Sequence, residues 1–222
     1  AASNDLQGKT ILITAGPTYE KIDPVRFIGN YSSGKMGFAL AEACARRGAK
    51  VRLIAGPVSL KADHPNILRT DVESADEMYE AAVSAFPDVE IAILSAAVAD
   101  YRPAAATQKI KREGRESLSL SLVRNRDIAA ALGERKRAGQ YLVGFALETN
   151  DGVAHAKEKL ARKNLDMIVL NSLEEEGAGF ACDTNKITVI DREGQMTGFP
   201  LKDKKAVADD ILDCLKTLIT KR

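Results

Sequence analysis

The sequence predicts an α/β protein with a doubly wound, mostly parallel, Rossmann-like sheet and helices on both faces. Short apolar runs rich in β-branched residues alternate with helical patterns over residues 1–95, as is typical of this class. The run at 91–94 shows no polar alternation, which is expected of a parallel strand covered on both faces. Glycine and proline turns follow the runs, so we expect ligand sites at the carboxyl ends of the strands.

Apolar runs and their end signals place the elements of the first half. Residues 19–36 form a connection much longer than an ordinary strand–helix turn. Gly48 marks a helix end, and Ser74 with Glu77 forms a capping box at a helix start. The expected elements are strands over residues 10–14, 51–54, 67–70 and 91–94 and helices over residues 37–47 and 74–86.

The second half departs from this regular alternation. Residues 102–117 are charged and alanine-rich, which predicts a surface flap. Residues 118–122 alternate between leucine and serine, which predicts a strand within a β-arm over about 117–123. Because no linker or repeat divides the chain, we expect one domain over residues 1–222. The other expected elements are helices over 127–137, 151–163 and 202–218 and strands over 141–145, 167–170 and 186–190.

Composition argues against several classes of function. The 222 residues are 45% hydrophobic and 28% charged, with a net charge of +1, so neither nucleic acid nor a membrane is an expected partner. Three cysteines without ligand spacing and two histidines give little support to a metal site or a serine–histidine triad. Reduced thiols, with no membrane-spanning run or signal-peptide core, predict a cytoplasmic protein.

The turn-rich segment over residues 29–37 is the first candidate site. It matches a Walker loop through Gly29, Gly34 and Lys35, but Met36 stands where a hydroxyl would hold Mg²⁺. The dinucleotide fingerprint GxGxxG does not occur here either. Serines and glycines before a helix offer main-chain N–H groups to an anion. A serine-capped helix start with glycines for packing explains the same pattern equally well.

Other candidate positions have side chains suited to binding, and each has a purely structural alternative. Asn30 can orient a carboxylate or acyl oxygen, or serve as a left-handed turn residue. Asp100 follows a run of small residues and can bind a ribose hydroxyl or a metal, or be solvated. Lys109 on the flap can neutralise developing negative charge, and Lys159 and Lys163 share a helix face suited to a triphosphate. Most such lysines are simply solvated.

Several segments, taken in order, match one family. They are residues 14–18, 23–30, 32–37, 96–101, 109–111, 144–146, 148–149 and 163–166. Together they resemble the phosphopantothenoylcysteine synthetases, the CoaB activity of coenzyme A biosynthesis, from about residue 8 to the terminal helix. In many bacteria this activity is the C-terminal half of a bifunctional protein, CoaBC or Dfp, whose other half is a flavin-dependent decarboxylase.

The resemblance implies a ligase that acts in two steps. The carboxylate of 4'-phosphopantothenate attacks the α-phosphate of CTP and releases pyrophosphate, and the amine of L-cysteine then displaces CMP from the acyl-cytidylate. Mg²⁺ would bridge phosphate oxygens and be held chiefly by the substrate. The resemblance also implies a homodimer, and a chain that is either monofunctional or cut from a fusion with the decarboxylase.

The same motifs imply roles for particular residues. Asn30 would hold the acyl-cytidylate, and Lys109 would act from the flap on the nucleotide or its leaving group. Arg26 and Asn30 are the expected substrate-binding residues, and Arg126 stands where the family pattern has a proline. The expected nucleotide-binding residues are Gly16, Ser32, Ser33, Gly34, Lys35, Met36, Gly37, Leu94, Ser95, Ala96, Asp100, Lys109, Val123, Arg124, Asn125, Arg126, Phe145, Lys159 and Lys163.

Two other classes share the predicted fold. The first is an NAD(P)-dependent oxidoreductase, because Tyr31 and Lys35 match the Tyr-x-x-x-Lys of short-chain dehydrogenases. That pair belongs on a helix deep in the chain, whereas here it lies in a turn near the N-terminus, and GxGxxG is missing. The second is a non-catalytic module that binds a nucleotide through the glycine loop. Fold alone does not separate these classes.

Overall fold

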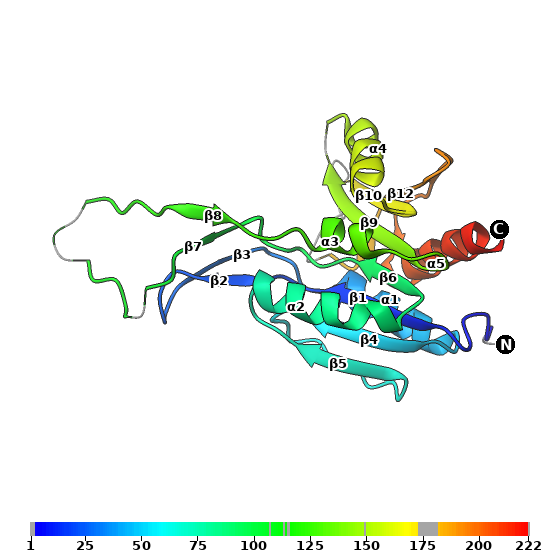
Figure 1. Cartoon of the computed structure of the whole chain (residues 1–222), viewed down its shortest axis with the longest axis horizontal. Helices are drawn as coiled ribbons and strands as arrows, with labels where there is room; N and C mark the ends of the chain where they lie inside the picture. The colour runs from blue at the N-terminus through cyan, green and yellow to red at the C-terminus, as the bar shows by residue number, and fades with distance from the viewer. Residues whose placement is uncertain are drawn as a thin grey trace.

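The computed structural model describes residues 3–106, 108–112, 114, 116–148, 150–172 and 182–221. Its central sheet is built from β1 (Thr10–Ala15), β4 (Lys50–Ala55), β5 (Ile67–Asp71), β6 (Ile91–Leu94), β9 (Tyr141–Glu148), β10 (Met167–Ser172), β12 (Ile187–Asp191) and β13 (Met196–Gly198). The strand order is β13-β12-β10-β9-β6-β1-β4-β5 (Figure 1). From β5 to β10 the strands are parallel, and β12 and β13 continue the sheet antiparallel. The predicted doubly wound, mostly parallel sheet is confirmed.

Helices cover both faces of this sheet. The helices are α1 (Lys35–Arg46), α2 (Ala75–Ala85), α3 (Ile128–Arg135), α4 (Gly152–Arg162), α5 (Lys204–Thr220) and the short 3-10 helix η1 (Phe86–Asp88). Ile11 and Ile13 of β1 pack in one core cluster with side chains of α1 and α5, and Leu12 packs in a second cluster with α2, α3 and α4. Because successive side chains of β1 meet apolar layers on opposite faces, the strand shows no polar alternation.

Helix ends follow the capping signals of the sequence. Ser74 Oγ accepts the main-chain N–H of Glu77 at 3.2 Å, so the predicted cap of α2 is confirmed. The Glu77 carboxylate accepts the amide of Glu73 rather than that of Ser74. The C-terminal helix begins later than predicted, at Lys204, because residues 202–203 form β14 (Lys202–Asp203) against β11 (Thr184–Asn185). Helix α1 begins two residues earlier than predicted.

Two hairpins project from the sheet as an arm. They are β2 (Tyr19–Lys21) with β3 (Phe27–Gly29), and β7 (Tyr101–Pro103) with β8 (Leu122–Arg124). β2 and β7 lie side by side, and the chain between β7 and β8 forms the far end of the arm (Figure 1). The long connection expected over residues 19–36 thus contains a hairpin. Positions 107, 113 and 115 of the expected flap lie outside the described residues.

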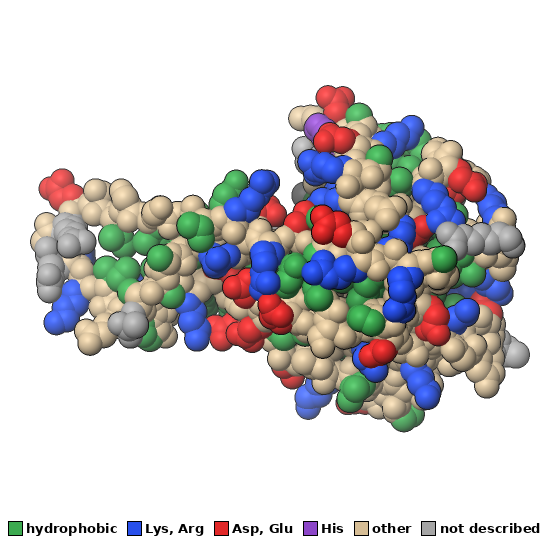
Figure 2. Space-filling view, in the orientation of Figure 1, with side chains coloured by type: hydrophobic (Ala, Val, Ile, Leu, Met, Phe, Trp, Pro, Cys, Tyr) green, Lys and Arg blue, Asp and Glu red, His purple; other side chains and the backbone are tan. Residues whose placement is uncertain are grey.

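The predicted strand over residues 118–122 is wrong. Residues 117–121 form no strand, and β8 begins only at Leu122. Leu118, Leu120 and Leu122 are 48%, 38% and 45% exposed, so within the described chain their alternation has no core to face. Figure 2 shows hydrophobic side chains gathered along the arm. The period-2 pattern therefore marks an apolar edge of the arm rather than a strand of the sheet.

A partly buried ion-pair network joins the N-terminus to α1 and α5. Arg47 Nη2 lies 2.6 Å from Asp5 Oδ2 and 2.9 Å from Asp213 Oδ1. Lys216 Nζ lies 3.1 Å from the same Asp5 oxygen. The hydrogen bond from Arg47 holds the pKa of Asp5 well below its usual value. The charged form of Asp5 is therefore the form that the folded state favours.

We expect Asp5→Asn to lower the free energy of unfolding by about 1–2 kcal/mol at pH 7. Because folding depresses the pKa of Asp5, its contribution is complete above the ordinary aspartate value of about 4 and is lost as the pH falls below it. Urea unfolding at pH 7 and at about pH 3 measures this difference. Asp209→Asn is the control, since Asp209 is half exposed and lies 3.7 Å from Arg47. An equal loss for Asp5→Asn at both pH values would contradict the prediction.

Candidate active site

The main pocket opens at the carboxyl ends of the parallel strands, where the strand order reverses between β1 and β6. In open α/β sheets this reversal is the usual place for a ligand. The pocket has a volume of about 320 Å³. It is lined by Gly16, Asn30, Ser32, Gly34, Lys35, Met36, Gly37, Ser95, Ala96, Ala97, Val98, Asp100, Phe145, Ala146, Leu147, Lys159, Asn171, Asn185 and Lys204.

The N-terminus of α1 forms one wall of this pocket. Gly34 is its N-cap with φ +80°, a conformation that favours glycine. Ser32 Oγ accepts the Gly34 amide, and Ser33 Oγ accepts the Lys35 amide, both at 3.3 Å. A Cβ on Gly37 would lie 2.4 Å from Ala15 Cβ, so this glycine lets the helix approach β1. The predicted glycine loop thus brings a positive helix end to the pocket, where an anion is favoured.

The ends of β1 and β6 form the floor. Ser95 Oγ donates to Thr14 O at 2.6 Å, and the Ala97 amide donates to Gly16 O at 2.9 Å. Gly16 has φ +82°, which a side chain would strain. The residues at 95–97 are small, and all three line the pocket. Leu94 itself is buried and is not part of the pocket lining.

Asn30 lies above this floor. It follows β3, and its Nδ2 donates to Ala97 O at 2.8 Å. This bond holds the carboxamide beside the end of β6, at the mouth of the pocket that Asp100 also lines. Two candidate residues that are 70 positions apart in the sequence thus meet in one site.

A second wall comes from β9 and α4. Lys159 Nζ donates to Phe145 O at 3.0 Å, and both residues line the pocket. Lys163 was expected to share this role, but its Nζ lies 2.7 Å from Asp127 Oδ2 and the residue is not part of the pocket lining. Asp127 caps α3 by accepting the Ala130 amide. Lys159 and Lys163 therefore have different surroundings, although they are four positions apart along α4 and its C-cap.

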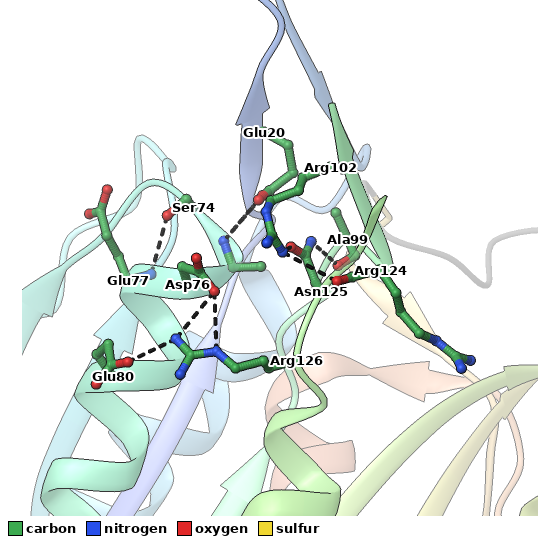
Figure 3. Close-up of polar contacts among 11 residues, drawn as sticks. Glu20, Ser74, Asp76, Glu77, Glu80, Ala99, Arg102, Arg124, Asn125 and Arg126 are labelled. Carbon is green, nitrogen blue, oxygen red and sulfur yellow. Dashed lines mark hydrogen bonds and ion pairs between the residues drawn. The ribbon is translucent and has the colours of Figure 1, made fainter. Parts of the chain in front are cut away.

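The segment after β8 supports the pocket without lining it (Figure 3). Asn125 is buried, and its side chain donates to Ala99 O and accepts from Arg102, both at 2.8 Å. Arg126 points to α2 instead, where it reaches Asp76 at 3.2 Å and Glu80 at 2.8 Å. Val123 and Arg124 are exposed on β8. Asn125 thus fixes the position of the 99–100 segment, while the Arg126 side chain pairs with the two acidic side chains of α2.

Arg26 and Lys109 lie together in a second pocket of about 680 Å³. It is lined by Arg26, Lys109, Ile110, Lys111, Arg112, Glu116, Ser117 and Leu118. Four of these side chains are basic and one, Glu116, is acidic, so the net positive charge of the lining favours an anion. Its lining has no residue in common with that of the main pocket. The two expected catalytic residues, Asn30 and Lys109, therefore line different pockets of one chain.

Three polar residues of the main pocket were not identified from the sequence. Lys204 is buried, its Nζ donates to Cys182 O, and burial lowers its pKa. Asn171 Oδ1 and Asn185 Oδ1 are buried and, within the described chain, have no hydrogen-bond partner. Asn171 lies near the carboxyl end of β10, where the rule used for β1 and β6 would have found it. Asn185 and Lys204 come from β11 and α5, which no motif marked.

The pocket suits a metal that the ligand largely holds. Within the described ranges there is no group of three or more His, Cys, Asp or Glu side chains that could hold an ion. The pocket instead offers the Asp100 carboxylate and the two buried amide oxygens of Asn171 and Asn185. Mg²⁺ commonly takes one or two protein oxygens together with substrate phosphates. These residues fit that pattern.

A parallel sheet with a helix N-terminus and lysines around a pocket at its order reversal defines the class: a Rossmann-like protein suited to a phosphate-bearing ligand. The model of one family, the DNA/pantothenate metabolism flavoprotein C-terminal domain, matches residues 6–218. The chain belongs to this family.

None of the helices in the described ranges has both the length and the apolar character to span a membrane.

The chain is similar to several named proteins. It is 52% identical over 214 residues to a prokaryotic "Cysteine/Cysteine sulfinic acid decarboxylase", covering 96% of this chain and 60% of that protein. It is 46% identical over 216 residues to the coenzyme A biosynthesis bifunctional protein CoaBC of Vibrio vulnificus (strain YJ016), covering 96% of this chain and 53% of that protein. The chain thus spans little more than half the length of these relatives. The crystal structure of a CoaBC C-terminal domain shares 42% identity and a TM-score of 0.84, covering 99% of this chain and 100% of that one.

Proposed function

We propose that this domain joins 4'-phosphopantothenate to L-cysteine at the expense of CTP, which is cleaved to CMP and pyrophosphate. The observation that carries the proposal is the main pocket, where Asn30, the N-terminus of α1 and Lys159 converge from three separate segments. Family membership and the likeness to CoaBC proteins support the same reaction. The names of the two relatives differ, but each relative is similar to this chain over only 60% or 53% of its own length.

The reaction needs positioning and charge compensation rather than a protein nucleophile. The substrate carboxylate attacks the α-phosphate, the acyl-cytidylate forms, and pyrophosphate leaves; the cysteine amine then attacks the acyl carbon, and CMP leaves. Main-chain N–H groups at residues 32–37 and the ammonium groups of Lys35 and Lys159 would compensate the phosphate charge. The Asn30 carboxamide would orient the acyl-cytidylate, and Lys109 and Arg26 would act from the basic second pocket.

The remaining nucleotide contacts belong to the same proposal. Gly16, Ser95, Ala96 and Phe145 would line the base and ribose side of the pocket, with Asp100 available to a hydroxyl or to Mg²⁺. The metal would supply charge neutralisation on the phosphates. Lys163 and the residues from 123 to 126 would act indirectly, through α3 and through the 99–100 segment.

We also propose that the domain works as a homodimer in the cytoplasm. The exposed leucines of the arm give a second copy an apolar surface to cover. In such a dimer, the basic second pocket of one copy would lie next to the main pocket of the other copy. Lys109 would then lie close to the reacting phosphates. In a longer protein, the domain would be joined to a flavin-dependent decarboxylase, as the partial coverage of CoaBC relatives supports.

Pyrophosphate release tests the proposal. The protein with CTP, Mg²⁺ and 4'-phosphopantothenate should release pyrophosphate in a single turnover, and L-cysteine should make the release continuous, with CMP as co-product. Omission of 4'-phosphopantothenate should abolish release, and ATP in place of CTP tests the nucleotide preference. Binding of CTP without turnover, or oxidation of NADPH, would contradict the proposal.

A further inference from the structure

One buried carboxylate links the flap to the β2–β3 hairpin. The side chain of Asp23 is fully buried at the turn of this hairpin. Its Oδ1 accepts the main-chain N–H groups of Val25 and Arg26 at 2.9 and 2.8 Å. Its Oδ2 accepts Arg26 Nε at 3.1 Å, Arg26 Nη2 at 2.6 Å and the Ile110 amide at 3.0 Å. One oxygen thus serves the turn, and the other binds Arg26 and the flap.

The Arg26 side chain completes this link. Its Nη2 also donates to Ile110 O at 2.8 Å, so the pair binds both polar main-chain groups of Ile110. Ile110 is 87 positions from Asp23 and adjoins Lys109, which lines the second pocket. The hydrogen bonds from Arg26 and Ile110 hold the pKa of Asp23 well below its usual value. The Asp23 carboxylate is therefore charged at neutral pH and can accept the hydrogen bonds from Arg26 and Ile110.

We propose that Asp23 is a positioning residue for Lys109, because its Oδ2 fixes the main chain at Ile110 and so sets where the Lys109 side chain begins. The inference rests on the proposed function, in which Lys109 acts on the nucleotide or its leaving group. A lysine side chain has several rotatable bonds, and an unanchored main chain adds further freedom that must be lost before the ammonium group can act. Asp23 removes that freedom in advance.

The variant Asp23→Asn distinguishes the roles of the two carboxylate oxygens. Asparagine keeps an oxygen for the Val25 and Arg26 amides and is favoured in such turns, so the fold should survive. Its NH₂ group cannot accept from Ile110 or pair with Arg26. Hydrogen–deuterium exchange over residues 108–112 should become roughly ten- to hundred-fold faster, the effect of losing a charge-assisted bond. The kcat of the ligase should fall roughly ten-fold or more, with little change in KM for CTP.

Asp191→Asn is the matched control. Asp191 Oδ1 accepts the Glu193 and Gln195 amides at 2.9 and 3.0 Å in the turn between β12 and β13. Since both bonds use the oxygen that asparagine retains, this variant should change neither exchange at 108–112 nor kcat. The double variant Asp23→Asn with Lys109→Gln should lose little more than Lys109→Gln alone, because coupled residues are not additive.

The outcomes separate the link from the proposed function. Exchange is measured without substrate, so it reads the link directly, whereas absent pyrophosphate release in the wild type would overturn the ligase and this role together. Unchanged exchange in Asp23→Asn, or a variant that fails to fold, would overturn the assignment of the two oxygens. Faster exchange with unchanged kcat, or additive losses in the double variant, would overturn the positioning role.

Discussion

Lys109→Gln should reduce ligase turnover about 10²- to 10³-fold, the effect of removing one group that compensates transition-state charge. The side chain is exposed and lies among basic residues of the second pocket. Loss of its charge should therefore leave the free energy of unfolding within about 0.5 kcal/mol of the wild type. Steady-state CMP formation and urea unfolding measure the two effects. The fall should appear in kcat, because the charge that Lys109 meets develops during transfer.

Lys111→Gln provides the matched control for this variant. It removes the same charge two positions further along the same segment, and Lys111 lines the same pocket. A purely electrostatic role of the pocket would make the two variants equally impaired, whereas a specific role of Lys109 makes Lys111→Gln much milder. Equal, mild losses in both variants would contradict the role assigned to Lys109. A large loss of stability in Lys109→Gln would contradict it as well.

The sheet could be predicted because its signals are local. An apolar run such as 91–94 is buried on both faces, and a residue such as Ser74 caps its own helix. The main pocket followed from the same signals, since the turns after β1 and β6 hold Gly16 and Ser95. Residues 32–37 were also found from a local signal, because serines and glycines directly precede the helical pattern of α1.

The arm and the outer residues of the site depend on partners that are distant in the sequence. The 118–122 alternation has the period of a strand, but the described chain pairs only its last residue, in β8. Lys163 and Arg126 had the charge for a phosphate, yet their side chains meet Asp127 and the acids of α2. No spacing along the chain indicates which carboxylate a lysine or arginine will meet. For the same reason the sequence did not indicate that Asp23 would bind Ile110, which is 87 positions away.

One motif used to recognise the family has a structural role instead of lining the pocket. In the segment 163–166, Asn164 has φ +55° and its side chain donates to Gly133 O at 2.9 Å. Asp166 is fully buried and accepts the Leu142 amide at 2.8 Å. It also pairs with Lys136 at 3.1 Å and with Arg192. Asp166 thus joins β9, the end of α3 and the turn after β12.

We expect Asp166→Asn to lower the free energy of unfolding by about 3–4 kcal/mol, because it leaves two partly buried cations without their shared carboxylate. The amide keeps the shape of the side chain, so the loss reports charge and hydrogen bonding rather than a cavity. Urea unfolding at neutral pH measures it. Glu158→Gln is the control: its pair with Arg162 is 3.6 Å long, with both side chains 64% exposed, and should contribute less than about 0.5 kcal/mol.

Comparing the kcat and the stability of Asp166→Asn also tests whether the 163–166 segment affects the pocket directly. β9 carries Phe145 three residues after Leu142, and Phe145 O receives Lys159. If the 163–166 segment only holds β9 in place, the pocket forms whenever the domain is folded. The kcat of Asp166→Asn, measured at urea concentrations well below the unfolding midpoint of this variant, should then stay within about two-fold of the wild type. A loss below 1 kcal/mol would contradict the buried-network argument. A fall in kcat without a loss of stability would show instead that this segment acts on the site itself.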